Sequence, residues 1–249
     1  MRYEHIVKGK FHSRPNRFIA KVWVPVDHGT GSVIGQGREV LEETADETSA
    51  QRAGMTLETV HVKNTGRCKE LLLPDAEVVL AVSDNPSRKT KYDLICVYKE
   101  GLGWVNIDSQ APNKVVLEWL RQQDYSFIKP EYTYGDSRID FYMEKGEQRY
   151  LMEVKGCTLE IDGIGYFPDA PTERGIKHLK ELAKAAKKDF ICYAAFVVQM
   201  EGIHEVRANV AAHKEFGEAL EEAKAAGVKV LCLGCKVTED FLVIDRVTE

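Results

Sequence analysis

Residues 131–155 read EYTYGDSRIDFYMEKGEQRYLMEVK, and this stretch decides both the fold class and the chemistry to look for. It contains two strand-like runs, Ser137–Met143 and Tyr150–Lys155. If these strands pair as a hairpin, the carboxylates of Asp140 and Glu153 converge and can share one hard cation. Mg²⁺ is typically bound by one or two carboxylates together with waters and substrate phosphate. The pattern therefore predicts a site for Mg²⁺ or Mn²⁺.

The second strand also supplies a lysine. Because side chains alternate faces along a strand, Glu153 and Lys155 share one face while Met152 and Val154 point into the core. A metal would polarise a phosphoryl oxygen and lower the pKa of a bound water, and Lys155 would orient that water or neutralise developing charge. The alternative is that the three charges are merely solvated or salt-bridged on exposed strand faces, since D-x(n)-E-x-K is short and common.

The composition is that of an ordinary globular protein, with 44% hydrophobic and 29% charged residues in 249. No apolar run approaches the roughly 18 residues of a membrane span, and the first residues are polar rather than signal-like. The six cysteines are scattered, which favours reduced thiols. We therefore expect a cytoplasmic protein with no membrane partner.

The net charge of −5 argues against nucleic acid, but its distribution does not. Segment 27–58 carries seven acids and two bases, so this segment alone accounts for 2 − 7 = −5. Elsewhere, bases cluster at 8–21 and at 88–91. Local basic patches attract phosphate whatever the global sum.

Two domains are expected. Residues 1–113 contain five short strand-like runs typical of a small barrel, interrupted by the acidic insertion at about 27–58, which we expect to be partly helical around 38–52. The five runs are 18–24, 60–63, 78–82, 93–98 and 104–107.

Residues 114–249 change character. Beyond the two strands of the opening stretch, they predict a helix near 115–120, a helix over 172–187, a buried strand over 190–198, a helix around Phe216–Ala223 and a last strand over 228–233. This order is that of an α/β sheet domain.

Eight ordered stretches of the chain resemble the sugar fermentation stimulation protein A family. The stretches are 16–18, 64–67, 87–94, 108–113, 137–141, 153–155, 167–170 and 174–179. The resemblance extends over nearly the whole chain except 27–58. The resemblance implies a DNA-binding protein with an N-terminal OB-type barrel and a C-terminal domain similar to PD-(D/E)xK nucleases. It would make Asp140 and Glu153 metal ligands, Lys155 the catalytic lysine and Glu131 a further catalytic acid.

Several cations are candidates for binding phosphate. Arg174 and His178 would grip the scissile phosphate beside the metal, while the basic clusters would follow the backbone. The turn at 64–67 suits a backbone contact with phosphate, or it is an ordinary barrel turn. The full expected set is Arg14, Arg17, Arg67, Arg88, Lys89, Arg138, Arg174 and His178.

The leading function is a DNA-binding protein with Mg²⁺- or Mn²⁺-dependent phosphodiesterase activity. The runner-up is a non-catalytic, DNA-binding regulator of sugar metabolism genes of the maltose type, which the family name implies. The absence of a helix-turn-helix signature counts against sequence-specific regulation. A sugar-metabolising enzyme has only the name behind it.

Overall fold

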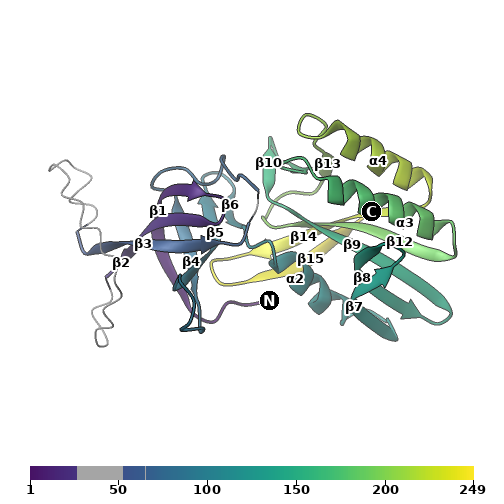
Figure 1. Cartoon of the computed structure of the whole chain (residues 1–249), viewed down its shortest axis with the longest axis horizontal. Helices are drawn as coiled ribbons and strands as arrows, with labels where there is room; N and C mark the ends of the chain where they lie inside the picture. Colours follow the sequence, from purple (N-terminus) through teal and green to yellow (C-terminus); the bar gives the residue numbers. More distant parts are fainter. Residues whose placement is uncertain (27–52, 65) are drawn as a thin grey trace.

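Residues 1–26, 53–64 and 66–249 are described by the structure, which is a computed structural model. The chain forms an N-terminal barrel and a C-terminal α/β unit, which lie side by side along the long axis of the molecule (Figure 1). No helix in these described ranges is long and apolar enough to cross a membrane.

The N-terminal unit is a closed five-stranded OB-type barrel with a sixth strand added at its edge. Its strands are β1 (Ile6–Asn16), β2 (Ile19–Pro25), β3 (Met55–Val62), β4 (Glu77–Val82), β5 (Tyr92–Lys99) and β6 (Gly103–Asn106). Parallel bridges between β3 and β5 close the circle, and β6 pairs only with β5. Inward-facing side chains such as Val22, Val60 and Leu94 are fully buried and fill the barrel.

All five strands predicted here are confirmed, but one of them does not belong to the closed barrel. The run at 104–107 is β6, which lies outside the closed circle, and β1 takes its place in the barrel. β1 was missed because its bases read as a basic cluster. A half-exposed barrel strand can carry such residues on its outer side, since only alternate side chains face the core.

The boundary expected for the acidic insertion also needs correction. β3 already begins at Met55 and pairs with β2 through Pro25↔Met55, so an insertion reaching residue 58 would overlap this strand. The helix expected around 38–52 lies outside the described residues.

The C-terminal unit is built on a six-stranded mixed sheet with the order β15-β14-β12-β9-β8-β7. Its strands are β7 (Phe127–Tyr134), β8 (Ser137–Lys145), β9 (Gln148–Cys157), β12 (Phe190–Val198), β14 (Lys229–Val237) and β15 (Leu242–Thr248). β9 and β12 lie centrally and pair in parallel from Phe190↔Arg149 to Val198↔Cys157. A small sheet of β10 (Leu159–Ile161), β11 (Ile164–Phe167) and β13 (Val206–Ala208) stands beside it.

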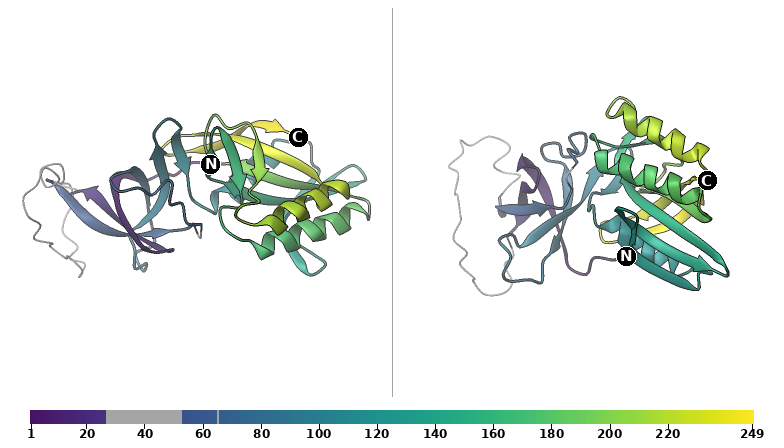
Figure 2. Two further views of the ribbon diagram at one scale, coloured as in Figure 1. Left: turned by 90° about the horizontal axis from the view of Figure 1, so that it is seen from above. Right: turned by 45° about the vertical axis from the view of Figure 1, so that its right-hand side comes forward.

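Helices cover both faces of the large sheet (Figure 2). α2 (Ala111–Leu120) packs with Met152 and Val154 on one face, whereas α3 (Glu173–Ala186) and α4 (Lys214–Ala225) pack with Leu151 on the other. Because both faces of β9 are covered by helices, successive side chains of this strand pack alternately into two hydrophobic cores. The predicted helix over 172–187 and the predicted strand over 190–198 are confirmed.

Several C-terminal strands were not predicted. β7 is exposed over most of its length and β15 alternates weakly, so neither carries a strong apolar period. β10, β11 and β13 are only three or four residues long. Short or edge strands acquire their structure from pairing, which a local pattern does not report.

The two units share a core and a polar junction. Val198, Met200 and Ile203 of the C-terminal unit belong to the same buried cluster as the barrel interior. The Gln199 Nε2 group donates to the Asn106 carbonyl at 3.0 Å and to the Asp108 carbonyl at 3.2 Å. These contacts fix the segment that leads from β6 into α2.

Candidate active site

Asp140 lies where β8 separates from β9. The pairing of these strands runs from Lys145↔Gln148 to Phe141↔Met152 and ends there. One residue further on, the Asp140 carboxylate replaces the next rung of the ladder: its Oδ2 accepts the Val154 backbone N–H at 2.8 Å. The Asn113 amide of α2 donates to Oδ1, also at 2.8 Å. The predicted hairpin is therefore confirmed, and it places Asp140 on the edge of a gap between two strands.

Glu153 is held from two sides. Its Oε1 accepts hydrogen bonds from the Lys155 ammonium group and from Nδ1 of His178 on α3. Its Oε2 is buried and has no hydrogen-bond partner. A buried carboxylate oxygen without a donor is costly unless a cation or solvent meets it. This atom is consequently the clearest sign of an incomplete coordination site.

The two carboxylates interact electrostatically. Burial, followed by the neighbouring Glu153 carboxylate, raises the pKa of Asp140 above its ordinary value. Burial also acts to raise the pKa of Glu153, but the hydrogen bond from His178 and the charge of Lys155 outweigh it and lower that pKa overall. Two partly desolvated carboxylates facing each other favour a bound divalent cation.

Of the alternative to a metal site, the structure excludes solvated charges on exposed strand faces, whereas Glu153 and Lys155 do form an ion pair. Glu153 is only 2% exposed because α3 covers its side of the sheet. The expectation that Glu153 and Lys155 lie on a common face is confirmed by their direct ion pair. Met152 and Val154 pack into the core on the α2 side, as predicted.

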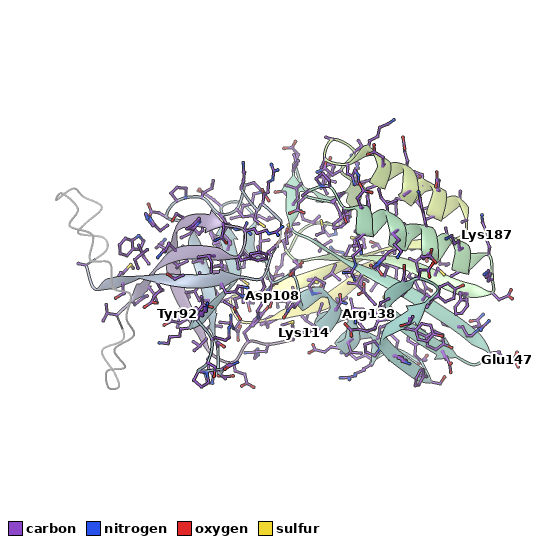
Figure 3. The ribbon with its side chains drawn as sticks, in the orientation of Figure 1. Tyr92, Asp108, Lys114, Arg138, Glu147 and Lys187 are labelled. Atoms are coloured by element: carbon purple, nitrogen blue, oxygen red, sulfur yellow. The ribbon has the colours of Figure 1, made fainter. Side chains whose placement is uncertain are left out.

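Glu131 does not join the carboxylate pair. It stands on β7 with a positive φ of 53°, a left-handed conformation that redirects its side chain. Its carboxylate is about two-thirds exposed and pairs with Arg138 at 3.6 Å. Arg138, near the start of β8, is labelled in Figure 3. Within the described residues, no group of three or more His, Cys, Asp or Glu side chains is placed to bind a metal. The expectation that Glu131 is a further acid of the site is therefore not met.

Arg174 and His178 differ in what they can offer to a phosphate. His178 is buried and donates to Glu153, while its Nε2 accepts from Arg174 Nε at 3.4 Å. Both ring nitrogens are thus hydrogen-bonded within the protein. His178 therefore positions Glu153 rather than binding the phosphate as expected. Arg174 is exposed on the first turn of α3, beside the site.

Two of the barrel arginines are structural in this arrangement. Arg14 donates to four backbone carbonyls, among them Asn64 at 2.7 Å and Gly66 at 2.9 Å, and so fastens the 64–67 turn. Arg88 forms a two-point contact with the buried Asp93, at 2.5 and 3.0 Å. The terminal nitrogens of both guanidinium groups donate within the protein, and Arg14 Nε is buried, so the expected role of these arginines as phosphate binders is corrected accordingly.

The remaining predicted cations are exposed. Arg17 stacks over the half-exposed Phe18 ring at 4.8 Å from its centroid. Arg67 and Lys89 also have exposed side chains. The structure gathers Asp140, Glu153, Lys155, His178 and Arg174 at one place and leaves these barrel cations on the other unit.

Asn113 has a role at the site that was not predicted from the sequence. Its amide holds Asp140 from α2, across the sheet. The residue stood in one of the family-like stretches, 108–113, so a signal was present. Only the packing of α2 against β9 reveals what it touches.

Family comparisons cover both units. Residues 13–107 match the SfsA N-terminal OB domain, and residues 110–241 match the sugar fermentation stimulation protein RE domain. The chain belongs to the sugar fermentation stimulation protein family. A family homolog from Desulfitobacterium hafniense is 46% identical over 245 residues, which are 97% of this chain and 94% of that protein. One from Clostridium beijerinckii is 46% identical over 246 residues, 97% of this chain and 96% of that protein.

A solved structure shares the whole architecture. It is described as Pyrococcus furiosus SfsA in complex with Ca²⁺, and it matches with a TM-score of 0.76 and 22% identity. The match covers 99% of this chain and 96% of that one, so the barrel and the α/β unit recur together in the family fold.

Proposed function

We propose that this chain is a DNA-binding phosphodiesterase that uses Mg²⁺ or Mn²⁺ at Asp140 and Glu153. The observation that carries the proposal is the buried Oε2 of Glu153, which has no partner and lies on the residue that interacts with Asp140. One or two carboxylates completed by water and phosphate are the usual ligands of Mg²⁺. The PD-(D/E)xK pattern implied by the family resemblance corresponds to these two carboxylates together with Lys155.

The roles of the side chains follow from their contacts. When bound, a divalent ion would supply Lewis acidity toward a phosphoryl oxygen and a more acidic water. Asn113 and the Val154 N–H orient Asp140, and His178 orients Glu153. Lys155, only 17% exposed, places its ammonium group where negative charge on a phosphate would develop. The exposed Arg174 would bind a non-bridging oxygen.

DNA is the proposed partner because the barrel belongs to a domain type that commonly binds oligonucleotides. Exposed Arg17, Arg67 and Lys89 would contact the backbone. The Pyrococcus furiosus relative is described with bound Ca²⁺, and a calcium-binding family member is consistent with a carboxylate site for divalent cations here.

A second candidate is a DNA-binding regulator of sugar metabolism genes without catalysis. Two observations favour it. The relatives are named for sugar fermentation, and the described residues offer no third metal-binding side chain beside Asp140 and Glu153. In that case Asp140 and Glu153 would persist as a binding feature with no turnover.

Incubation of the pure protein with labelled branched, single-stranded and duplex DNA separates the two candidates. The phosphodiesterase predicts products in Mg²⁺ or Mn²⁺, none in a chelator, and none from Asp140→Asn. Tight binding of every substrate with no product under any of these conditions would refute the phosphodiesterase and support the non-catalytic regulator.

A further inference from the structure

α3 begins beside the candidate site and carries a row of exposed cations away from it. Arg174, in the first turn of this helix, donates through Nε to His178, which in turn donates to Glu153. Further cations follow at about one per helical turn, which corresponds to about 5.4 Å along the helix axis. Lys187 lies at the end of α3 that is farthest from the barrel (Figure 3). The α3 row consists of Arg174, Lys177, Lys180, Lys184 and Lys187.

The exposed face of α3 is ionic rather than apolar. Its apolar side chains, such as Ile176, Leu179 and Leu182, are buried in the core that the helix shares with the sheet and α4. Residues 174–188 contain six bases and one acid, so this segment carries 6 − 1 = +5 in a chain whose net charge is −5. The helix therefore offers a partner electrostatic contacts and has no apolar face left to insert into a lipid surface.

The neighbouring helix α4 provides a comparison, because it is also a surface helix on the same side of the sheet. It contains two bases and four acids, so 2 − 4 = −2. Both of its lysines are ion-paired along the helix, Lys214 with Glu218 at 3.0 Å and Lys224 with Glu221 at 2.9 Å. This is the usual pattern of a solvated helix face, in which charges of both signs alternate. The α3 row departs from it.

Most of the α3 row lacks an acidic partner. Only Lys184 is paired, with Glu181 at 2.8 Å, and among the described residues Lys180 and Lys187 form no ion pair. Lys180 and Lys184 are spaced i,i+4, and like charges at this spacing destabilise a helix unless an anion neutralises them. The helix dipole favours cations in the last turn but disfavours them in the first, so it does not account for Arg174. The α3 row thus has the electrostatics of a binding surface for a polyanion.

We propose that the α3 row binds consecutive phosphates of the DNA strand whose scissile phosphate lies at the Asp140–Glu153 pair. The inference rests on the proposed function and extends it, since it gives the strand a path from the site along α3 toward Lys187. From Arg174 to Lys187 the helix rises about 20 Å, at about 1.5 Å per residue. At about 3.4 Å per nucleotide of a stacked strand, the path covers about six nucleotides on one side of the cleaved bond.

The salt dependence of binding tests the α3 row without turnover. The full chain is titrated with a single-stranded oligonucleotide in a chelator, at several salt concentrations. Lys180→Gln/Lys187→Gln should lower the slope of log affinity against log salt by about 1.4, at about 0.7 per phosphate contact of a single strand. The matched control is Lys214→Gln/Lys224→Gln, which removes the same charge from α4 and should leave the slope unchanged. Equal slopes for the two variants overturn the proposal.

Photocrosslinking locates the strand independently of charge. A cysteine-directed photocrosslinker is attached to Lys187→Cys and, as the control, to Lys224→Cys in the last turn of α4. Five of the six native cysteines are buried, and the unsubstituted chain corrects for labelling of the partly exposed Cys232. The label at 187 should crosslink to the oligonucleotide, and the label at 224 should not. Equal crosslinking from the two positions contradicts the proposal.

The outcome is separable from that of the proposed function. DNA binding that depends on the α3 row, without cleavage in Mg²⁺ or Mn²⁺, supports the row and refutes hydrolysis. Metal-dependent cleavage by a chain whose binding is indifferent to Lys180→Gln/Lys187→Gln refutes the row and leaves hydrolysis standing. Loss of binding to anionic lipid vesicles in this variant, with DNA binding unchanged, would assign the row to a membrane surface and overturn the proposal.

Discussion

Replacing His178 by alanine should weaken divalent-metal binding without unfolding the protein. The imidazole supplies one of the two hydrogen bonds on Glu153 Oε1, and Lys155 supplies the other. Loss of one hydrogen bond to a charged group costs about 1.5–3 kcal/mol. At about 1.4 kcal/mol per factor of ten, metal affinity should fall by about 10- to 100-fold. This is also the range typical of residues that orient metal ligands.

The assay is calorimetric titration of Mn²⁺ into the wild type and the variants, with thermal unfolding as a check on folding. His178→Asn should recover much of the affinity, because its amide can donate from about the position of Nδ1. His213→Ala is the control: this histidine is also buried, but it pairs with Glu173 at the start of α3 and with Glu215 in the first turn of α4. Unchanged Mn²⁺ affinity in a folded His178→Ala protein, or an equal loss in His213→Ala, would refute the positioning role.

Three further perturbations test other parts of the structure. Lys155→Ala removes the other hydrogen bond on Glu153 Oε1 and should also weaken Mn²⁺ binding. At saturating Mn²⁺ it should still lower turnover by about 10²–10³-fold, as measured by single-turnover cleavage, because transition-state charge loses its partner. Asp93→Asn should lower the free energy of unfolding by about 1.5–3 kcal/mol near neutral pH, because the partly exposed Lys63 and Arg88 lose hydrogen bonds to a charged partner. Hydrogen bonds to Asp93 outweigh its burial and hold its pKa well below the usual range. Its stabilisation is therefore present above the ordinary pKa of about 4 and is lost as pH falls through the folded pKa, so denaturation curves of the two proteins should converge in acid. Arg14→Ala should lower the melting temperature of the barrel, whereas Arg17→Ala should leave it unchanged and reduce the salt dependence of DNA binding by a slope of about 0.7–0.9. A lower melting temperature for Arg17→Ala together with an unchanged one for Arg14→Ala would contradict the contacts described for these two arginines.

Much of the fold could be predicted from periodicity. β12 is a continuous apolar run, and α3 has an apolar face with Thr172 as its N-cap, so both have strong local signals. β1 and β7 do not, since their side chains are half exposed and largely polar. Such strands are specified by their neighbours in the sheet rather than by their own pattern.

The candidate site shows the same division. Asp140, Glu153 and Lys155 follow from alternation along two paired strands. The burial of Glu153 depends on α3, which arrives later in the chain, and the role of Asn113 depends on α2 crossing the other face. Positive charge alone did not distinguish Arg14, which fastens a turn, from Arg17, which lies on the surface. These roles arise from contacts between distant segments.

If the Asp140–Glu153 pair supports phosphodiester cleavage, other acids nearby should be dispensable for it. The most direct measurement compares Mn²⁺-dependent cleavage of labelled single-stranded DNA by the wild type, Glu153→Gln and Glu131→Gln. The structure predicts products from the wild type and from Glu131→Gln, whose carboxylate lies exposed beside Arg138, and none from Glu153→Gln. Cleavage that persists in Glu153→Gln, or a wild type that releases no product, would contradict it.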